Sequence, residues 1–111
     1  MAYDEGLADR VRIILKRRKG ITEKKMFGGL CFLHQGNMCC GINDADLMLR
    51  LGEPGAQAAL QEPNTREMDF TGRPIKTMLY VSAKGLKSDE ALRDWVGRAL
   101  AFAKTLPPKE K

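Results

Sequence analysis

Short apolar runs separated by turn-forming pairs fill the middle of this sequence, over residues 26–51. The pairs are Gly28-Gly29, Gln35-Gly36 and Asn43-Asp44. Runs of this length, rich in Leu, Phe, Cys, Met and Ile and bounded by such residues, are typical of strands joined by tight turns. The middle of the chain therefore predicts an antiparallel sheet built from successive hairpins.

The Gln35-Gly36 pair sets the register of one predicted hairpin. With a two-residue loop, His34 lies opposite Asn37. Counting back along both strands places Cys31 opposite Cys40, in a non-hydrogen-bonded pair with Cα atoms about 4.5 Å apart. That spacing would allow a strained, redox-labile disulfide. The alternative, which we favour, is that both are small buried thiols that pack as hydrophobic groups.

Alternation along these strands divides their side chains between the two faces of the sheet. Because the flanking helices are expected to cover one face only, Leu30, Phe32 and Met48 would be left on the other. We predict that these three form an apolar surface that binds a partner protein or a second copy of the chain, as a homodimer. The core face would carry Cys31, Leu33, Met38, Cys40 and Ile42.

Amphipathic patterns flank the strands on both sides. Apolar residues recur at spacings of three and four positions over residues 4–19 and again over residues 88–103, as on one face of a helix. Asp4 and Ser88 are suitable N-caps, because their side-chain oxygens can accept hydrogen bonds from the first turn. Gly20 is suited to end the first helix. The sequence therefore predicts a long helix near each end.

The remaining segments complete the order of elements. Residues 54–61 resemble a short helix, and residues 66–70 and 75–82 resemble strands. The order is helix, three or four strands, short helix, two strands and long helix. It predicts an α+β fold, a two-layer sandwich with helices packed mainly on one face of an antiparallel sheet. We expect one domain over residues 1–106 and a flexible tail over residues 107–111.

Composition limits the class of protein. Apolar residues make up 43% and charged residues 30%, a globular balance. No apolar run approaches the roughly 20 residues that cross a bilayer, and the acidic N-terminus does not resemble a secretory signal. The three cysteines are an odd number clustered in ten residues, which favours reduced thiols. We expect a cytoplasmic protein that does not enter a membrane.

Positive charge gathers at the end of the first predicted helix and just beyond it. Such a patch could neutralise nucleic-acid phosphates in a salt-dependent way that is independent of sequence. The alternative, which we favour, is a solvated helix end stabilised by the helix dipole. Few aromatic residues are available for base stacking, and no recognition-helix motif is present. The residues concerned are Arg12, Lys16, Arg17, Arg18, Lys19, Lys24 and Lys25.

Catalytic patterns are absent from the sequence. His34 is the only histidine, and it is expected at an exposed turn. Cys31, Cys39 and Cys40 lack the paired Cys-x-x-Cys spacing of zinc sites, and a nucleophilic thiol needs an adjacent base. We therefore expect no metal, no cofactor and no enzymatic activity.

Five motifs occur in an order and spacing typical of one family. On these motifs, residues 1–104 resemble the N-terminal domain of the TfoX (Sxy) competence regulators. The resemblance implies a fold similar to type III secretion chaperones, with helix, three strands, helix, two strands and helix. It implies no catalytic or ligand-binding residue. The motifs are Glu23-Lys24-Lys25-Met26-Phe27-Gly28-Gly29, Gly36-Asn37-Met38, Met48-Leu49-Arg50, Met-Asp-Phe-Thr-Gly-Arg-Pro over residues 68–74, and Tyr80-Val81.

The resemblance also suggests a role. Competence regulators of that family carry a second, C-terminal domain of helix-hairpin-helix character and act with a cyclic AMP receptor protein at promoters. We expect this chain to be a stand-alone member without that domain. Its expected function is non-enzymatic regulation through protein binding. One alternative is an accessory role in nucleic-acid binding, directly or through a transcription factor, and a second is a small thiol redox module.

Overall fold

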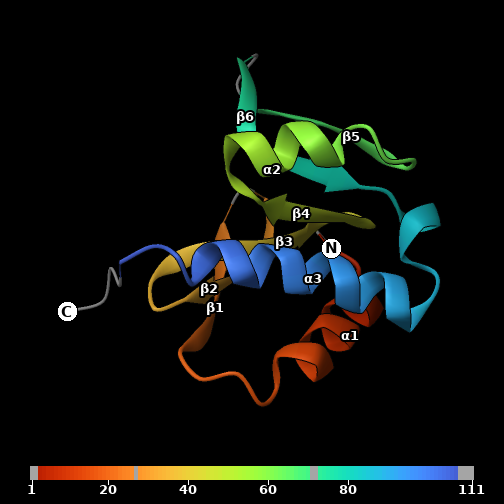
Figure 1. The fold of residues 1–111 in the computed structure, drawn as a ribbon. Helices are drawn as coiled ribbons and strands as arrows, with labels where there is room; N and C mark the ends of the chain where they lie inside the picture. The colour runs from red at the N-terminus through yellow and green to blue at the C-terminus, as the bar shows by residue number, and fades with distance from the viewer. Residues whose placement is uncertain (1–2, 27, 71–72, 108–111) are drawn as a thin grey trace.

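Six antiparallel strands pair into one sheet in the computed structural model, in the order β1-β2-β3-β4-β6-β5 (Figure 1). The structure describes residues 3–26, 28–70 and 73–107. Strands β1 to β4 follow one another through short connections, so neighbours in sequence are neighbours in the sheet. The strands are β1 (Ile21–Met26), β2 (Gly29–His34), β3 (Asn37–Asn43), β4 (Asp46–Arg50), β5 (Thr65–Phe70) and β6 (Arg73–Val81).

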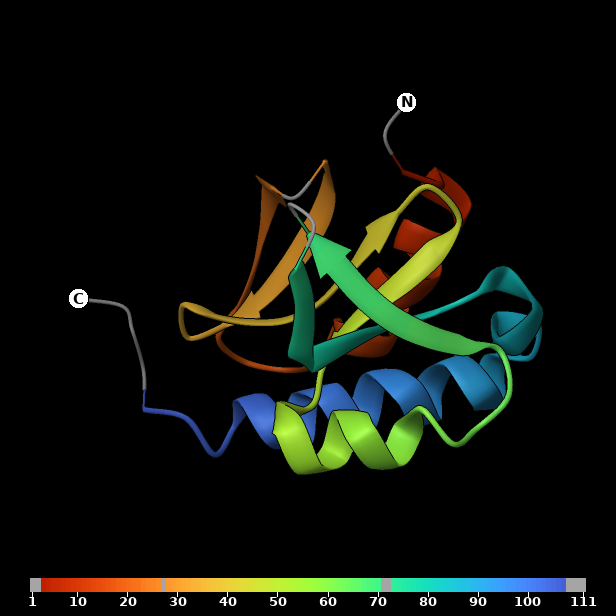
Figure 2. The same cartoon turned by 90° about the horizontal axis from the view of Figure 1, so that it is seen from above.

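Three α-helices accompany the sheet: α1 (Glu5–Leu15), α2 (Gly52–Ala59) and α3 (Asp89–Ala103). A short 3₁₀ helix, η1 (Ala83–Leu86), precedes α3. All three α-helices contribute to one core against the same face of the sheet, and in Figure 2 α2 and α3 lie together below the strands. The predicted α+β, two-layer fold class is confirmed, with four strands before α2.

Local hydrogen bonds fix the helix starts. The Asp4 side chain accepts a hydrogen bond from the Leu7 backbone N–H at 3.0 Å, and the Ser88 hydroxyl oxygen accepts one from the Ala91 N–H at 3.0 Å. Both predicted N-caps are therefore confirmed. Helix α1 ends at Leu15, four residues before the predicted end, because the basic residues that follow have no apolar side chain to bury against the core.

The main core lies between the sheet and the helices. Trp95 and Leu100 of α3 and Val11 of α1 pack there against strand residues that include Phe32 and Ile42. Burying each of these side chains contributes roughly 1.5 to 3 kcal/mol.

A β-bulge in β3 overturns the predicted register. His34 pairs with Asn37 as predicted, but Phe32 then pairs with Cys40 and Cys31 with Gly41, because Cys39 is an extra residue in β3. Beyond a bulge, one strand is displaced by one residue relative to its partner. Cys40 and Ile42 therefore share the helix-covered face with Leu30 and Phe32, so the predicted core face was wrong.

The opposite face of the sheet holds a second, smaller core. Ile75 and Tyr80, both partly buried, pack against it. In Figure 2 both ends of the sheet curl toward this side, so the sheet shields part of its own apolar surface. The buried members of this cluster are Cys31, Met38, Met48, Met68 and Met78.

Strands β1 and β5 form the two edges of the sheet, and β1 was not singled out from the sequence because its residues 22–25 are polar and exposed. The carbonyl oxygen of Pro107 accepts a hydrogen bond from the buried Asn37 amide at 2.8 Å. Residues 108–111 of the predicted tail and residues 27, 71 and 72 of the family motifs lie outside the described residues. No helix of the described segments is long and apolar enough to cross a membrane.

Candidate functional site

The predicted partner surface is not a surface. Leu30 and Phe32 are 4% and 1% exposed and lie under the helices, in the main core. Met48 is fully buried in the methionine cluster on the other side of the sheet. The three side chains therefore neither face solvent nor share a face, and this prediction was wrong. The prediction assumed that a sheet face not covered by helices is exposed to solvent, whereas this face holds a buried cluster of its own.

The predicted redox pair is also separated. Cys31 lies opposite Gly41, and Cys40 lies opposite Phe32, so the two thiols belong to the clusters on opposite faces of the sheet. All three cysteines are buried thiols. Burial raises the pKa of Cys31 to about 11. A hydrogen bond with Cys39, followed by burial, raises the pKa of Cys40 well above its ordinary value. The alternative of thiols packed as hydrophobic groups fits this arrangement.

The basic residues at the two ends of the predicted patch are either paired with carboxylates or divided between the faces of the sheet. Arg12 forms ion pairs with Glu23 and Asp9, each at 2.8 Å. Its hydrogen bond to Glu23 is the main cause of a raised pKa at Arg12 and a lowered pKa at Glu23. Lys24 and Lys25 are successive residues of β1 and so project to opposite faces of the sheet. These residues do not form one continuous positive surface.

The other four basic residues stay together. Lys16, Arg17, Arg18 and Lys19 follow directly after α1, and all are exposed. Within the described segments, none of them has a carboxylate within ion-pair distance. This stretch therefore keeps its full positive charge.

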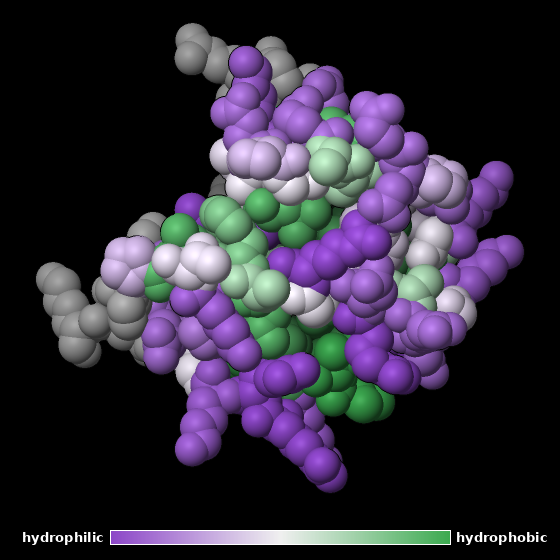
Figure 3. Space-filling model, viewed as in Figure 1, coloured by the Kyte–Doolittle hydropathy of each residue, from purple (hydrophilic) through white to green (hydrophobic). Residues whose placement is uncertain are grey.

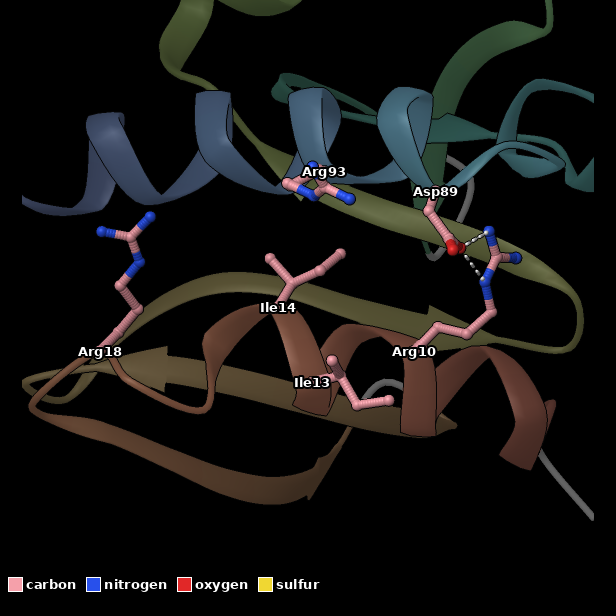
Figure 4. Close-up of a pocket in the computed structure, with 6 residues that line it drawn as sticks. All are labelled: Arg10, Ile13, Ile14, Arg18, Asp89 and Arg93. Atoms are coloured by element: carbon pink, nitrogen blue, oxygen red, sulfur yellow. Dashed lines mark hydrogen bonds and ion pairs between the residues drawn. The ribbon is translucent and has the colours of Figure 1, made fainter.

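A groove of about 330 Å³ lies between α1 and α3, and we call it the α1–α3 groove. Figure 4 shows its walls: Ile13 and Ile14 rise from α1, Arg93 lies along α3 above Ile14, and Arg18 reaches toward α3 from beyond the end of α1. Its lining residues are Arg10, Ile13, Ile14, Arg18, Asp89 and Arg93.

Ile13 is the apolar feature of this groove. Its side chain is 72% exposed, and it is the one large hydrophobic residue exposed in the described part of the chain. Ile14 beside it is partly buried and packs against the main core. Figure 3 shows hydrophobic surface over α1 bordered by hydrophilic side chains. A single exposed isoleucine is ordinary, but one at the rim of a charged groove is suited to contact a partner.

The charges of the groove do not balance. Arg10 donates two hydrogen bonds to one carboxylate oxygen of Asp89, at 3.1 and 3.3 Å, so their charges compensate each other. Arg18 and Arg93 are exposed and have no carboxylate within ion-pair distance among the described residues. Two guanidinium groups are therefore available to an anionic ligand beside the isoleucines.

The groove continues past the end of α1. A second hollow, of about 440 Å³, shares Ile13, Ile14 and Arg18 with it and adds Lys16 and Arg17. The two hollows together form an extended surface with apolar residues along its middle and positive charge at its border. An elongated ligand could contact both.

Sequence reasoning missed this site although one signal was present. The apolar stripe of α1 consists of the buried Leu7, Ala8, Val11 and Leu15, and Ile13 lies off that stripe. The signal was an isoleucine on the polar side of an amphipathic helix, three residues before a run of four basic residues. The position of Arg93 opposite it could come only from the packing of α1 beside α3.

Groups suited to nucleophilic or acid–base chemistry lie elsewhere. His34 is 9% exposed at the end of β2, and its Nδ1 atom has no hydrogen-bond partner within the described structure. Among the described residues, no group of three or more His, Cys, Asp or Glu side chains is placed to hold a metal ion.

Comparison with known proteins identifies the family. A family model described as the TfoX N-terminal domain matches residues 14–103. No curated protein and no solved structure matches the chain. The matched segment includes the strands, α2, α3 and the basic end of α1. Because it covers most of the 111 residues, this chain belongs to the TfoX N-terminal domain family.

Proposed function

We propose that this protein is a regulatory domain that acts in the cytoplasm by binding another protein, without catalysing a reaction. The observation that carries the proposal is the α1–α3 groove, where the exposed Ile13 lies beside Arg18 and Arg93, two arginines without a carboxylate partner among the described residues. Arginine is enriched at protein interfaces, and an exposed apolar side chain gains free energy when a partner covers it. The regulatory part of the proposal is supported by membership of the TfoX N-terminal domain family.

The absence of catalysis is supported by where the reactive groups lie. A nucleophilic thiol must be partly ionised and accessible, yet all three cysteines are buried and the pKa values of Cys31 and Cys40 are raised. His34, the one histidine, is buried away from the groove. The groove itself offers arginines, isoleucines and a single carboxylate that is already bound to Arg10.

The proposal is tested by affinity capture from the cells that make the protein, followed by reconstitution. Wild type, Ile13→Asp and the control Lys84→Glu are used as baits, because Lys84 is exposed in η1 and does not line the groove. We expect a protein that binds wild type and the control but is depleted with Ile13→Asp, and that binds wild type again after purification. No protein retained by wild type above an unrelated bait would contradict the proposal.

A second candidate function, direct nucleic-acid binding, is favoured by the uncompensated charge of residues 16–19. Their exposed side chains could contact phosphates. A duplex titrated at several salt concentrations should then show an affinity that falls steeply with salt, by a slope of about 0.9 per phosphate contacted. Replacing Lys16 and Arg17 together by Glu should abolish binding, whereas Lys84→Glu should leave most of it. Equal binding by both variants would exclude this stretch as the contact.

A further inference from the structure

We infer that the occupant of the α1–α3 groove is an acidic amphipathic helix of a different protein, an inference that rests on the function proposed above. The helix would place apolar side chains on Ile13 and Ile14 and carboxylates beside Arg18 and Arg93. A groove between two helices is a common receptor for an amphipathic helix that presents apolar side chains at spacings of three and four residues.

The exposed Ile13 favours a ligand with apolar side chains. An isoleucine that is 72% exposed gains free energy when a partner covers it, by about 25 cal/mol for each Å² of apolar surface removed from water. A nucleic-acid backbone offers phosphates and sugars at this position and little that is apolar. The isoleucines therefore favour a protein ligand over a nucleic acid at the groove, even though both would be attracted by the arginines.

Arg18 and Arg93 favour a ligand that carries carboxylates. Arg18 and Arg93 approach the groove from different elements, one just beyond α1 and one on α3 (Figure 4). A guanidinium group can bind a carboxylate through two parallel hydrogen bonds. The extension of the groove adds Lys16 and Arg17 on the same border. A ligand with carboxylates flanking an apolar stripe complements this border.

The continuity of the two hollows along α1 favours an elongated ligand such as a helix. The lining runs from Arg10 to Arg18 along α1 and the residues after it and includes Asp89 and Arg93 on α3, and the second hollow extends it past the end of α1. On α3, Gly97 follows Arg93 by four residues and thus lies on the same side of the helix. It is exposed, and a Cβ atom added there would meet nothing within 4 Å. A second helix backbone has room to approach along this side.

A second copy of this chain is a poor occupant, because its helices offer no acidic face. Asp9 and Asp94 pair with arginines of their own helices, and Asp89 pairs with Arg10. The remaining carboxylates of the helices, Glu5, Glu53 and Glu90, lie on three different helices. The complementary surface must therefore come from another protein.

The experiment uses three synthetic peptides of about 18 residues, long enough to form a helix when bound. The first carries leucines at helical spacings with flanking glutamates. The second has the same composition in an order that destroys the amphipathic face. The third is the first peptide with its glutamates replaced by lysines. Each peptide carries a fluorophore, and its binding to the full chain is followed by fluorescence anisotropy, with duplex DNA as a fourth probe.

The protein variants test the apolar contact and the charge contact separately. Ile13→Asp removes the apolar contact, and Arg18→Glu combined with Arg93→Glu reverses the charge at the groove. Lys84→Glu is the matched control, since it changes an exposed charge that lies outside the groove. All four positions are exposed, and circular dichroism checks that each variant is folded.

We expect the acidic amphipathic peptide to bind wild type and Lys84→Glu alike and to bind both groove variants about tenfold more weakly or worse. The double charge reversal should instead gain affinity for the lysine peptide. Equal binding of the scrambled peptide, or binding of DNA without the peptide, would overturn the inference. If no peptide binds while cellular capture still yields a partner that depends on Ile13, the proposed function stands and the acidic helix is the wrong occupant.

Discussion

Arg12 of α1 holds Glu23 of β1 through two hydrogen bonds, from Nε to Oε2 at 2.8 Å and from Nη2 to Oε1 at 2.9 Å. This paired contact ties the first helix to an edge strand whose residues 22–25 are exposed. It also links stability to pH. The hydrogen bond to Arg12 lowers the pKa of Glu23 below its ordinary value of 4.5.

We predict that the pair stabilises the protein modestly and only above the acid range. Because the pKa of Glu23 is lowered in the folded state, its contribution is present above pH 4.5 and is lost as the pH falls through the lowered pKa. Both side chains are 39% exposed, so solvent screening limits the contribution to about 0.5 to 1 kcal/mol.

Urea denaturation from pH 7 down to pH 3 checks this prediction. Glu23→Gln should be less stable than wild type at pH 7 and should approach it at pH 3, because protonation removes the same interaction from wild type. Glu53→Gln, at an exposed position on α2, is the control. A constant difference between Glu23→Gln and wild type across this range would show that the pair is not the cause.

Ile13 and Phe32 should respond in opposite ways to truncation. Ile13 is 72% exposed and Phe32 is 1% exposed, so Ile13→Ala should change the free energy of unfolding by less than about 0.5 kcal/mol. Phe32→Ala should cost about 3 to 5 kcal/mol, since it leaves a cavity under the helices. Chemical denaturation measures both, and a comparable loss for the two variants would contradict the placement of either side chain.

Gly52 should not tolerate alanine. Its φ angle is 79°, and an added Cβ would lie 2.6 Å from Cε1 of the Phe102 ring. We expect Gly52→Ala to destabilise the protein by about 1 to 3 kcal/mol, through both backbone strain and the displaced ring. Thermal unfolding measures the effect, and an unchanged midpoint would mean that the start of α2 is built differently.

Alanine at Gly97 should stabilise the protein, in contrast to alanine at Gly52, and Gly97→Ala is therefore the matched control for Gly52→Ala. Gly97 lies inside α3 with open space around it, so Gly97→Ala should stabilise the fold by about 0.5 to 1 kcal/mol. The same methyl group would approach any helix docked beside Arg93. Wild-type stability in Gly97→Ala would indicate that α3 is not a regular helix at this point.

The three thiols should be inert in the native state. Burial, with a pKa of about 11 at Cys31, keeps the reactive thiolate scarce at neutral pH. We expect a thiol reagent at pH 8 to label none of the three quickly in native protein and all three in denaturant. Mild oxidant should leave the count unchanged, and loss of two thiols with a new intramolecular disulfide would revive the pairing that the bulge excludes.

Features determined by neighbouring residues were predicted correctly from the sequence. The N-caps Asp4 and Ser88 depend only on the first turn of their helices. The turn at Gln35 and Gly36 depends on two residues that both adopt positive φ, 49° and 86°, as a two-residue hairpin loop requires. These local rules were enough to give the fold class and the start of the hairpin register.

Features determined by distant residues were not predictable. The bulge at Cys39 shifts the register of β3 against β2, and in the result both Cys39 and Cys40 are buried with the helix-side core. No local pattern distinguishes this from regular alternation. The α1–α3 groove likewise depends on how two helices distant in sequence pack together. The sequence alone therefore could not predict that Ile13 and Arg93 line the same groove.

Charged side chains border the two edges of the sheet. Strands β1 and β5 have one side without a neighbouring strand, and such sides can recruit strands from other molecules into fibrils. Lys24, Lys25, Arg66 and Glu67 project from these borders and are exposed, and stacking identical copies there would bring like charges together. The same residues that make β1 hard to recognise as a strand thus act against edge-to-edge pairing between molecules.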